Sequence, residues 1–277
     1  MTSSKLNFGC GNRFRNGWTN IDFQGVESHV TSVNLLRRLP FSDAAFDVVY
    51  SSHVLEHFSP GQADFVLSEC YRVLMPSGIL RIVVPDLEDT CREYLQTLAI
   101  DDDDDLKRQK YDWIVIELLD QLVRSKPGGQ MEQRMKDILA SDSNDLKSYL
   151  LSRTESSVGG GMAIMRVKRS LVSKLLRITP ARLREKVAKA YLSFVKLLLP
   201  HSLRQLVFVE TDPGERHQWM YDRYGLKMKL TSAGFQNVAL MPYNQSNIKG
   251  FNQDFLDINP DGTSYKNVSL YAECIRP

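Results

Sequence analysis

The chain has 277 residues, of which 43% are hydrophobic and 25% charged, and its formal net charge is +2. This balance is typical of a globular protein with one large core, or one core and a sizeable insertion, and it excludes a polycation that binds partners through bulk charge. The four cysteines form no C-x-x-C pair, which argues against a zinc ribbon, and no apolar run approaches the roughly 20 residues that span a bilayer. No signal segment is recognisable at the N-terminus, so we expect a cytoplasmic protein.

The first part of the chain alternates between strand-like and helix-like segments. The predicted strands are residues 5–8, 18–23, 28–35, 46–52 and 79–84. The run 46–52 is rich in β-branched and aromatic residues, which is typical of a strand buried on both faces. Strands and helices in this order predict a parallel sheet with helices on both faces.

Two helices are predicted between and after these strands. The first begins at Ser59 and Pro60, because serine is a good N-cap and proline fits the first turn. Its inward face is expected to include Phe65. The second begins at Asp86 and is expected to bury Leu95.

The middle of the chain interrupts this alternation. Helical patterns without intervening strands cover residues 111–124 and 131–151. Sheet-like sequence then resumes, with predicted strands at 237–241 and 269–275. We therefore divide the chain into residues 1–99 and 216–277, which form one domain together, and a helical insertion at 100–215.

Polar residues follow several of the predicted strands directly. They include the segment 9–12, Asp22, the pair Ser52-His53, and Asp86. Ligands of parallel sheets bind beyond the carboxyl ends of the strands, where these residues would converge. This edge of the sheet is the predicted functional site.

Gly9 and Gly11 follow the first strand directly. Glycine lets the backbone turn sharply and lets a ligand approach without a side chain in the way. Asp22, at the end of the second strand, can accept hydrogen bonds from both hydroxyls of a ribose. A tight turn beside a solvated aspartate fits these residues equally well, because the third glycine of a dinucleotide fingerprint is missing.

Four ordered blocks between residues 5 and 88 extend this pattern. They read L-N-F-G-C-G-N, N-I-D, L-P-F-S-D-A-A-F-D-V-V-Y-S-S-H-V-L-E-H and E-C-Y-R-V-L-M-P-S-G-I-L-R-I-V-V-P-D-L. Together they resemble class I S-adenosylmethionine-dependent methyltransferases, most of all the type 11 branch. The resemblance implies an α/β fold: a Rossmann-like, seven-stranded, mostly parallel sheet whose last strand is antiparallel, with a helical insertion after the fifth strand.

The same resemblance implies S-adenosylmethionine as cofactor and methyl transfer to a small-molecule, sugar or lipid-linked saccharide acceptor. We expect the methylated atom to be oxygen, because of the candidate bases described below and the breadth of the family. It places a set of residues around the cofactor: Asn7, Gly9, Cys10, Gly11, Asp22, Asn34, Leu35, Ser51 and Ser52. Asn34 stands where many relatives carry an aspartate that contacts adenine. The link from Gly11 to Trp18 is too short for the usual crossover helix, so we expect a turn there.

Methyl transfer to a hydroxyl requires that its proton be removed. The candidate bases are His53, Asp86 and His217, and a histidine is attractive because its ordinary pKa of about 6.5 leaves it largely neutral at working pH. Trp219 and Tyr221 are candidates for a substrate wall, although the segment that carries them fits core packing equally well.

Arg124, in the insertion, is a further substrate candidate, because the segment after the fifth strand often covers the acceptor in enzymes of this kind. It can pair with an acceptor carboxylate or phosphate, or with Asp120 on its own helix.

Residues His53 to His57 spell H-x-x-E-H, which also matches an inverted zinc-protease signature. On a helix, His53 and His57 would share one face, so a zinc-dependent hydrolase using them with Glu56 is an alternative. A third ligand would have to come from far along the chain, and we therefore expect no metal. A catalytically inactive module that still binds S-adenosylmethionine is the other alternative.

Residues 166–204 contain eleven Lys or Arg and one acid, interleaved with apolar residues at helical spacing. The ordinary interpretation is a pair of helices with solvated basic faces. The sharper hypothesis is peripheral contact with an anionic membrane surface. A nucleic-acid partner is not expected, because no recognition module is apparent, and the sequence gives no oligomeric state.

Overall fold

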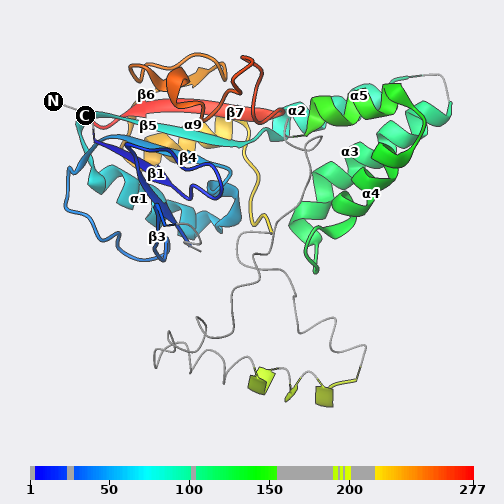
Figure 1. Cartoon of the computed structure of the whole chain (residues 1–277), viewed down its shortest axis with the longest axis horizontal. Coiled ribbons are helices and arrows are strands. Elements are labelled where there is room, and N and C mark those ends of the chain that lie inside the picture. Colours follow the sequence, from blue (N-terminus) through cyan, green and yellow to red (C-terminus); the bar gives the residue numbers. More distant parts are fainter. Residues whose placement is uncertain are drawn as a thin grey trace.

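A seven-stranded sheet forms the centre of the molecule in the computed structural model, which describes residues 4–23, 28–100, 104–154, 190–192, 194–195, 197–200 and 216–277. The strands are β1 (Lys5–Phe8), β2 (Thr19–Asp22), β3 (Val30–Ser32), β4 (Phe46–Ser52), β5 (Leu74–Pro85), β6 (Gln236–Met241) and β7 (Ser269–Ile275). Their order is β3-β2-β1-β4-β5-β7-β6, and β7 runs antiparallel to both of its neighbours (Figure 1). The predicted Rossmann-like fold with an antiparallel last strand is confirmed.

Strand β5 begins earlier than the predicted 79–84. Helix α1 (Pro60–Val73) ends at Val73 and β5 begins at the next residue, so the segment expected to separate helix from strand is already part of β5. The additional residues are accommodated by a shift of register, in which Phe46 pairs with Leu74 but Val48 with Ile79. Such a bulge adds residues to one strand without moving the rest of the ladder.

Helix α1 begins as predicted, with Ser59 as its N-cap. The side chain of Gln62 accepts a hydrogen bond from the Ser59 backbone N–H at 3.0 Å, which completes half of a capping box. The expectation that Phe65 faces inward is wrong, since it is 38% exposed. The buried stripe runs through Val66 and Cys70 instead, and Phe65 precedes this stripe by one residue, about 100° around the helix.

Leu95 is also exposed, at 62%, contrary to expectation. It lies on α2 (Leu87–Leu98), which leaves the end of β5 and packs against α3 (Asp105–Val123) instead of lying across the sheet. The face of α2 that becomes buried is therefore set by α3 and includes Thr90 and Thr97.

The two faces of the sheet are covered differently. Helices α1 and α9 (Arg223–Ser232) pack their apolar side chains on one face. On the other face, the described residues that cover the sheet are Trp18, just before β2, and the segment 242–268, which contains the short helix η3 (Phe251–Asp254). The expectation of helices on both faces is therefore wrong for this face.

A buried ionic network fastens segment 242–268 to the sheet. Arg81 of β5, which is fully buried, donates to Asp257 at 2.6 Å and to Glu273 of β7 at 2.8 Å. The hydroxyl of Tyr50, on β4, donates to the other oxygen of Asp257 at 2.6 Å. Each buried charge is thus paired and hydrogen-bonded, as a low-dielectric interior requires.

Helices α3, α4 (Gly129–Ala140) and α5 (Asn144–Arg153) lie beyond one end of the sheet (Figure 1). They share a small core made by Trp113, Met135, Ile138, Leu146 and Leu150. The predicted helical stretch 131–151 is divided in two, because Ser143 caps the start of α5 by accepting from the Leu146 N–H. The helical insertion after the fifth strand is confirmed, while its boundaries at 100 and 215 stay predictions.

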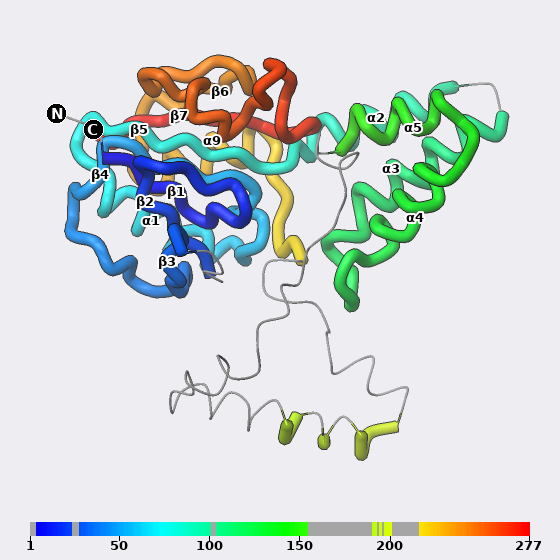
Figure 2. The backbone as a smooth tube through the Cα atoms, viewed as in Figure 1, coloured from blue at the N-terminus to red at the C-terminus, as the bar shows by residue number. Residues whose placement is uncertain are grey.

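Figure 2 shows the chain leaving the sheet after β5, passing through α2 to α5, and returning along residues 216–222 to α9. The basic segment 166–204 lies outside the described residues except for 190–192, 194–195 and 197–200. Among the helices of the described ranges, none has both the length and the apolar character needed to cross a membrane.

Candidate functional site

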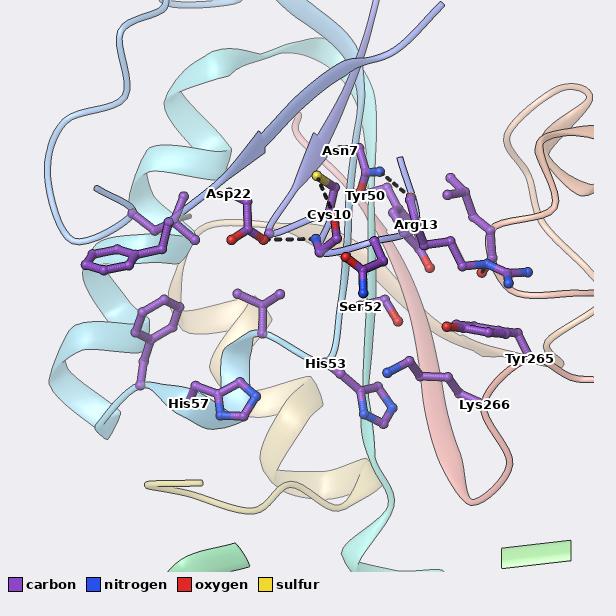
Figure 3. A pocket seen from close by; sticks show the side chains of 18 of the residues that line it. Asn7, Cys10, Arg13, Asp22, Tyr50, Ser52, His53, His57, Tyr265 and Lys266 are labelled. Atoms are coloured by element: carbon purple, nitrogen blue, oxygen red, sulfur yellow. Dashed lines mark hydrogen bonds between the residues drawn. The ribbon is translucent and has the colours of Figure 1, made fainter. Parts of the chain in front are cut away.

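A cavity of about 470 Å³ opens at the carboxyl ends of β1, β2 and β4 (Figure 3). Several residues predicted around the cofactor line it, together with one predicted base: Asn7, Gly9, Cys10, Gly11, Asp22, Leu35, Ser52 and His53. Figure 3 shows Asp22 on one side of the cavity and Tyr265 and Lys266 on the other. The strand ends therefore converge where the parallel topology requires.

The glycine turn forms one wall of this cavity. Gly9 has a φ of +67°, and its N–H donates to the Ile21 carbonyl at 2.8 Å. Gly11 has a φ of +51°, and its N–H donates to the Asp22 carboxylate at 2.9 Å. The turn thus orients Asp22, and turns without a helix lead from Gly11 to β2, as expected.

Two of the predicted cofactor residues do not line the cavity. Asn34 uses its side-chain oxygen to accept from the Leu36 N–H at 2.9 Å, which forms a local turn. Ser51 is buried within β4. Leu35 and Leu36, which follow Asn34, do line the cavity and give it an apolar wall.

Arg13, Tyr265 and Lys266 also line the cavity and were missed by the sequence analysis. Arg13 donates to the backbone carbonyls of Leu256 and Ile258, and its guanidinium lies 3.4 Å from the centre of the Tyr265 ring. Its place directly after the glycine turn was a usable signal. Tyr265 and Lys266 belong to no motif, and nothing local in the sequence points to them.

A cluster of one acid and three histidines adjoins the cavity, and we call it the His–Glu cluster: His53, Glu56, His57 and His217. Glu56 is 1% exposed, and its Oε1 lies 3.7 Å from His53 Nδ1, 3.9 Å from His57 Nε2 and 4.0 Å from His217 Nε2. His53 and His57 also line the cavity. The cluster therefore connects a buried carboxyl group to the candidate site.

The segment 53–57 is not the α-helix that the motif suggested. His53 has a φ of +53°, and only Leu55–His57 form a short 3₁₀ helix, η1. His217 is brought to the cluster by backbone hydrogen bonds: its N–H donates to the Gln121 carbonyl at 2.9 Å, and the Gln218 N–H donates to the Glu56 carbonyl at 2.8 Å.

The contacts within the cluster are not ion pairs. Burial raises the pKa of Glu56 to about 8 and lowers the pKa of His217 to about 3. Burial also lowers the pKa of His53 well below its ordinary value, and that of His57 falls for the same reason. At neutral pH the imidazoles are therefore neutral and can offer lone pairs.

The other predicted site residues lie outside the cavity lining. Arg124 pairs with Asp120 on its own helix at 3.1 Å, which is the local alternative. Trp219 is half-exposed, whereas Tyr221 is buried with its hydroxyl unpaired among the described residues. Asp86 caps α2 by accepting from the N–H groups of Glu88 and Asp89.

The capping role of Asp86 gives a direct prediction. Asp86→Ala should lower the free energy of unfolding by about 1 kcal/mol, because two N–H groups of α2 lose their acceptor, whereas Asp86→Ser should restore most of it. Urea denaturation measures both changes. If Asp86 is instead a base, Asp86→Ser will be stable but will not turn over.

Residues 15–82 match the family model described as "Methyltransferase domain". This part of the chain is therefore similar to methyltransferase domains of the type 11 branch. The matched range includes β2 to most of β5, and with them Asp22 and the segment 53–57 of the His–Glu cluster. It begins after Gly9 and Gly11, so the role of the glycine turn in this domain rests on its geometry.

One curated relative is a "Probable S-adenosylmethionine-dependent methyltransferase" from Mycolicibacterium smegmatis, 47% identical over 51 residues, which cover 18% of this chain and 19% of the relative. This chain thus spans about a fifth of the length of the relative that it matches. The comparisons favour neither the zinc-dependent hydrolase nor the inactive module.

Two solved structures are similar over part of the chain. An arsenic(III) S-adenosylmethionine methyltransferase from Chlamydomonas reinhardtii is 21% identical, with 31% of this chain and 39% of that chain covered and a TM-score of 0.25. The N1-methyltransferase of 1,6-didemethyltoxoflavin from Burkholderia thailandensis, solved with S-adenosylhomocysteine, is 20% identical, with coverages of 30% and 45% and a TM-score of 0.26. TM-scores this low support no inference about this chain.

The residues of the cavity fit S-adenosylmethionine, the cofactor that the similarity to methyltransferases implies. The cavity volume of about 470 Å³ lies within the usual range for small-molecule sites. Asp22 offers a carboxylate to ribose hydroxyls, Leu35 and Leu36 offer an apolar wall to an adenine ring, and the bare backbone of Gly11 leaves open space, since a Cβ there would meet nothing within 4 Å.

Proposed function

We propose that this chain is an S-adenosylmethionine-dependent methyltransferase that methylates an oxygen of a small-molecule or saccharide acceptor. The observation that carries the proposal is the convergence of the glycine turn and Asp22 on one cavity within a methyltransferase domain. The bound cofactor supplies the electrophilic methyl group. The protein has to hold the cofactor and acceptor in line and keep the acceptor oxygen able to react.

The residues of this chain divide that work between them. Asp22, fixed by the Gly11 N–H, would hold the nucleoside end of the cofactor. His53, at the end of β4, lies on the cavity wall, where its imidazole would help to position an acceptor hydroxyl. Lys266 and Tyr265, on the opposite side, would contact the remainder of the ligands.

The test is calorimetric titration with S-adenosylhomocysteine. Asp22→Asn should weaken its binding by about 10- to 100-fold, because a hydrogen bond to a charged group contributes about 1.5–3 kcal/mol. Formation of S-adenosylhomocysteine in a screen of hydroxyl-bearing acceptors then measures turnover.

The control is Asp137→Asn on α4. Within the described residues, the exposed carboxylate of Asp137 accepts a side-chain hydrogen bond from Gln133 alone. It should bind S-adenosylhomocysteine like the unchanged protein. If Asp22→Asn and Asp137→Asn bind S-adenosylhomocysteine with equal affinity, Asp22 is not a cofactor-binding residue. If the unchanged protein does not bind S-adenosylhomocysteine, the proposed cofactor is wrong.

A further inference from the structure

The His–Glu cluster contains buried polar atoms that the described part of the protein leaves unsatisfied. Neither carboxyl oxygen of Glu56 has a hydrogen-bond partner there, and the same is true of His217 Nδ1. Leaving one such group buried and unpaired costs about 1–3 kcal/mol, so native proteins seldom do so without a reason. The distances of 3.7–4.0 Å from the three imidazoles to Glu56 Oε1 are too long for hydrogen bonds.

The spacing of these atoms is close to that of ligands around one metal ion. One ligand atom each from Glu56, His57 and His217 lie within 4.8 Å of one another. Nitrogen and oxygen ligands lie about 2.0–2.2 Å from zinc, which puts two of them roughly 3.4 Å apart in tetrahedral geometry. The separations of 3.9 and 4.0 Å, and the limit of 4.8 Å for the whole set, exceed this value, so the side chains must move inward to bind one ion.

The hydrogen bonds around the cluster leave an unprotonated imidazole nitrogen facing Glu56, as metal binding requires. His57 Nδ1 donates to the Arg216 carbonyl at 3.1 Å, so its Nε2 carries the lone pair and faces Glu56. Metal-ligating histidines are usually oriented by such a bond from the other ring nitrogen. His53 is held in the same manner, with Nε2 at 2.9 Å from Ser269 Oγ and Nδ1 toward Glu56.

We propose that Glu56, His57 and His217 bind one divalent transition-metal ion, Zn²⁺ or a neighbouring ion, with His53 beside it. Two histidines and one carboxylate form the ligand set of sites that keep a coordination position open, and imidazole favours these ions over Mg²⁺. Because His57 lines the cavity, the open position serves an acceptor oxygen. This last step rests on the proposed function and narrows its acceptors to molecules with a metal-binding hydroxyl, whose deprotonation the ion favours.

The H-x-x-E-H motif has no third metal ligand near it in the sequence, which is why no metal is expected from the sequence alone. The structure supplies that ligand as His217, which is 160 residues beyond His57 in the chain. The backbone bonds from His217 to Gln121 and from Gln218 to Glu56 hold it in place. The ligand set therefore differs from that of the zinc hydrolase alternative.

The experiment is titration of chelator-treated, desalted full-length protein with Zn²⁺ alone, then Mn²⁺ and Mg²⁺ alone, followed by metal analysis after gel filtration. We expect one Zn²⁺ per chain. Glu56→Gln and His217→Ala should each weaken Zn²⁺ binding by at least about 100-fold, because even residues that only orient metal ligands contribute about 10- to 100-fold. The visible spectrum of bound Co²⁺ should change in the same two variants.

His29→Ala is the matched control, because His29 stacks on Phe14 and is not one of the clustered ligand residues. It should bind Zn²⁺ like the unchanged protein, and circular dichroism will show whether each variant is folded. Absence of stoichiometric Zn²⁺, or equal affinity in the folded Glu56→Gln and His29→Ala variants, overturns the metal site. Titration of the chelated, unchanged protein with S-adenosylhomocysteine tests the proposed function separately.

Discussion

Gly9→Ala should reduce the affinity for S-adenosylhomocysteine by at least about tenfold, which corresponds to about 1.4 kcal/mol. A Cβ on Gly9 would lie 2.4 Å from Val54 Cγ2, and the φ of +67° disfavours any residue with a side chain. Val54 also lines the cavity, so a shift of Val54 or of the glycine turn that relieves this clash changes the shape of the cavity. Calorimetry measures the affinity, and urea denaturation measures the accompanying loss of stability.

Gly17→Ala is the control for Gly9→Ala, because it introduces backbone strain without a steric clash. Gly17 has a φ of +81°, a Cβ there would meet nothing within 4 Å, and the residue does not line the cavity. It should lose about 1 kcal/mol of stability and no affinity. The double variant Gly9→Ala with Val54→Ala should recover part of the binding, because the clashing methyl groups are gone. Full affinity in Gly9→Ala itself would show that the glycine turn is not a cofactor wall.

Arg81→Met should lower the free energy of unfolding by about 3–5 kcal/mol, because it leaves Asp257 and Glu273 buried without their common partner. The effect should extend to the site. Asp257 lies in the segment whose neighbouring residues Leu256 and Tyr265 line the cavity, and Arg81 and Tyr50 hold that carboxylate. S-adenosylhomocysteine affinity should therefore fall even under conditions where the variant is folded.

Arg92→Met is the control for this prediction. Arg92 is exposed and pairs with Glu88 one helical turn away at 2.8 Å, so its loss should cost only about 0.3–0.5 kcal/mol. Urea denaturation of both variants gives the comparison. A loss below about 1 kcal/mol in Arg81→Met would mean that the network contributes little, as is known for buried charges that hydrophobic packing can replace.

Only part of the His–Glu cluster could be predicted from the sequence. The motif identified His53, Glu56 and His57 as a group, but the same motif suggested an α-helix, and the backbone at His53 is left-handed instead. His217 was singled out only as a possible base. Its position beside Glu56 depends on backbone hydrogen bonds between segments far apart in the chain, and no local pattern encodes those.

The sequence by itself determined the features that depend on near neighbours along the chain. Strands β1, β4 and β7, the Ser59 cap of α1 and the turn at Gly9 and Gly11 follow from local sterics, alternation and capping chemistry, and they lie where the sequence places them. Only the tertiary structure decided which helix faces are buried, as at Phe65 and Leu95, and what covers the second face of the sheet. The physical reason is that burial and the closing of a site depend on which distant segment packs there, and packing against segment 242–268 brings Tyr265 and Lys266 to the cavity.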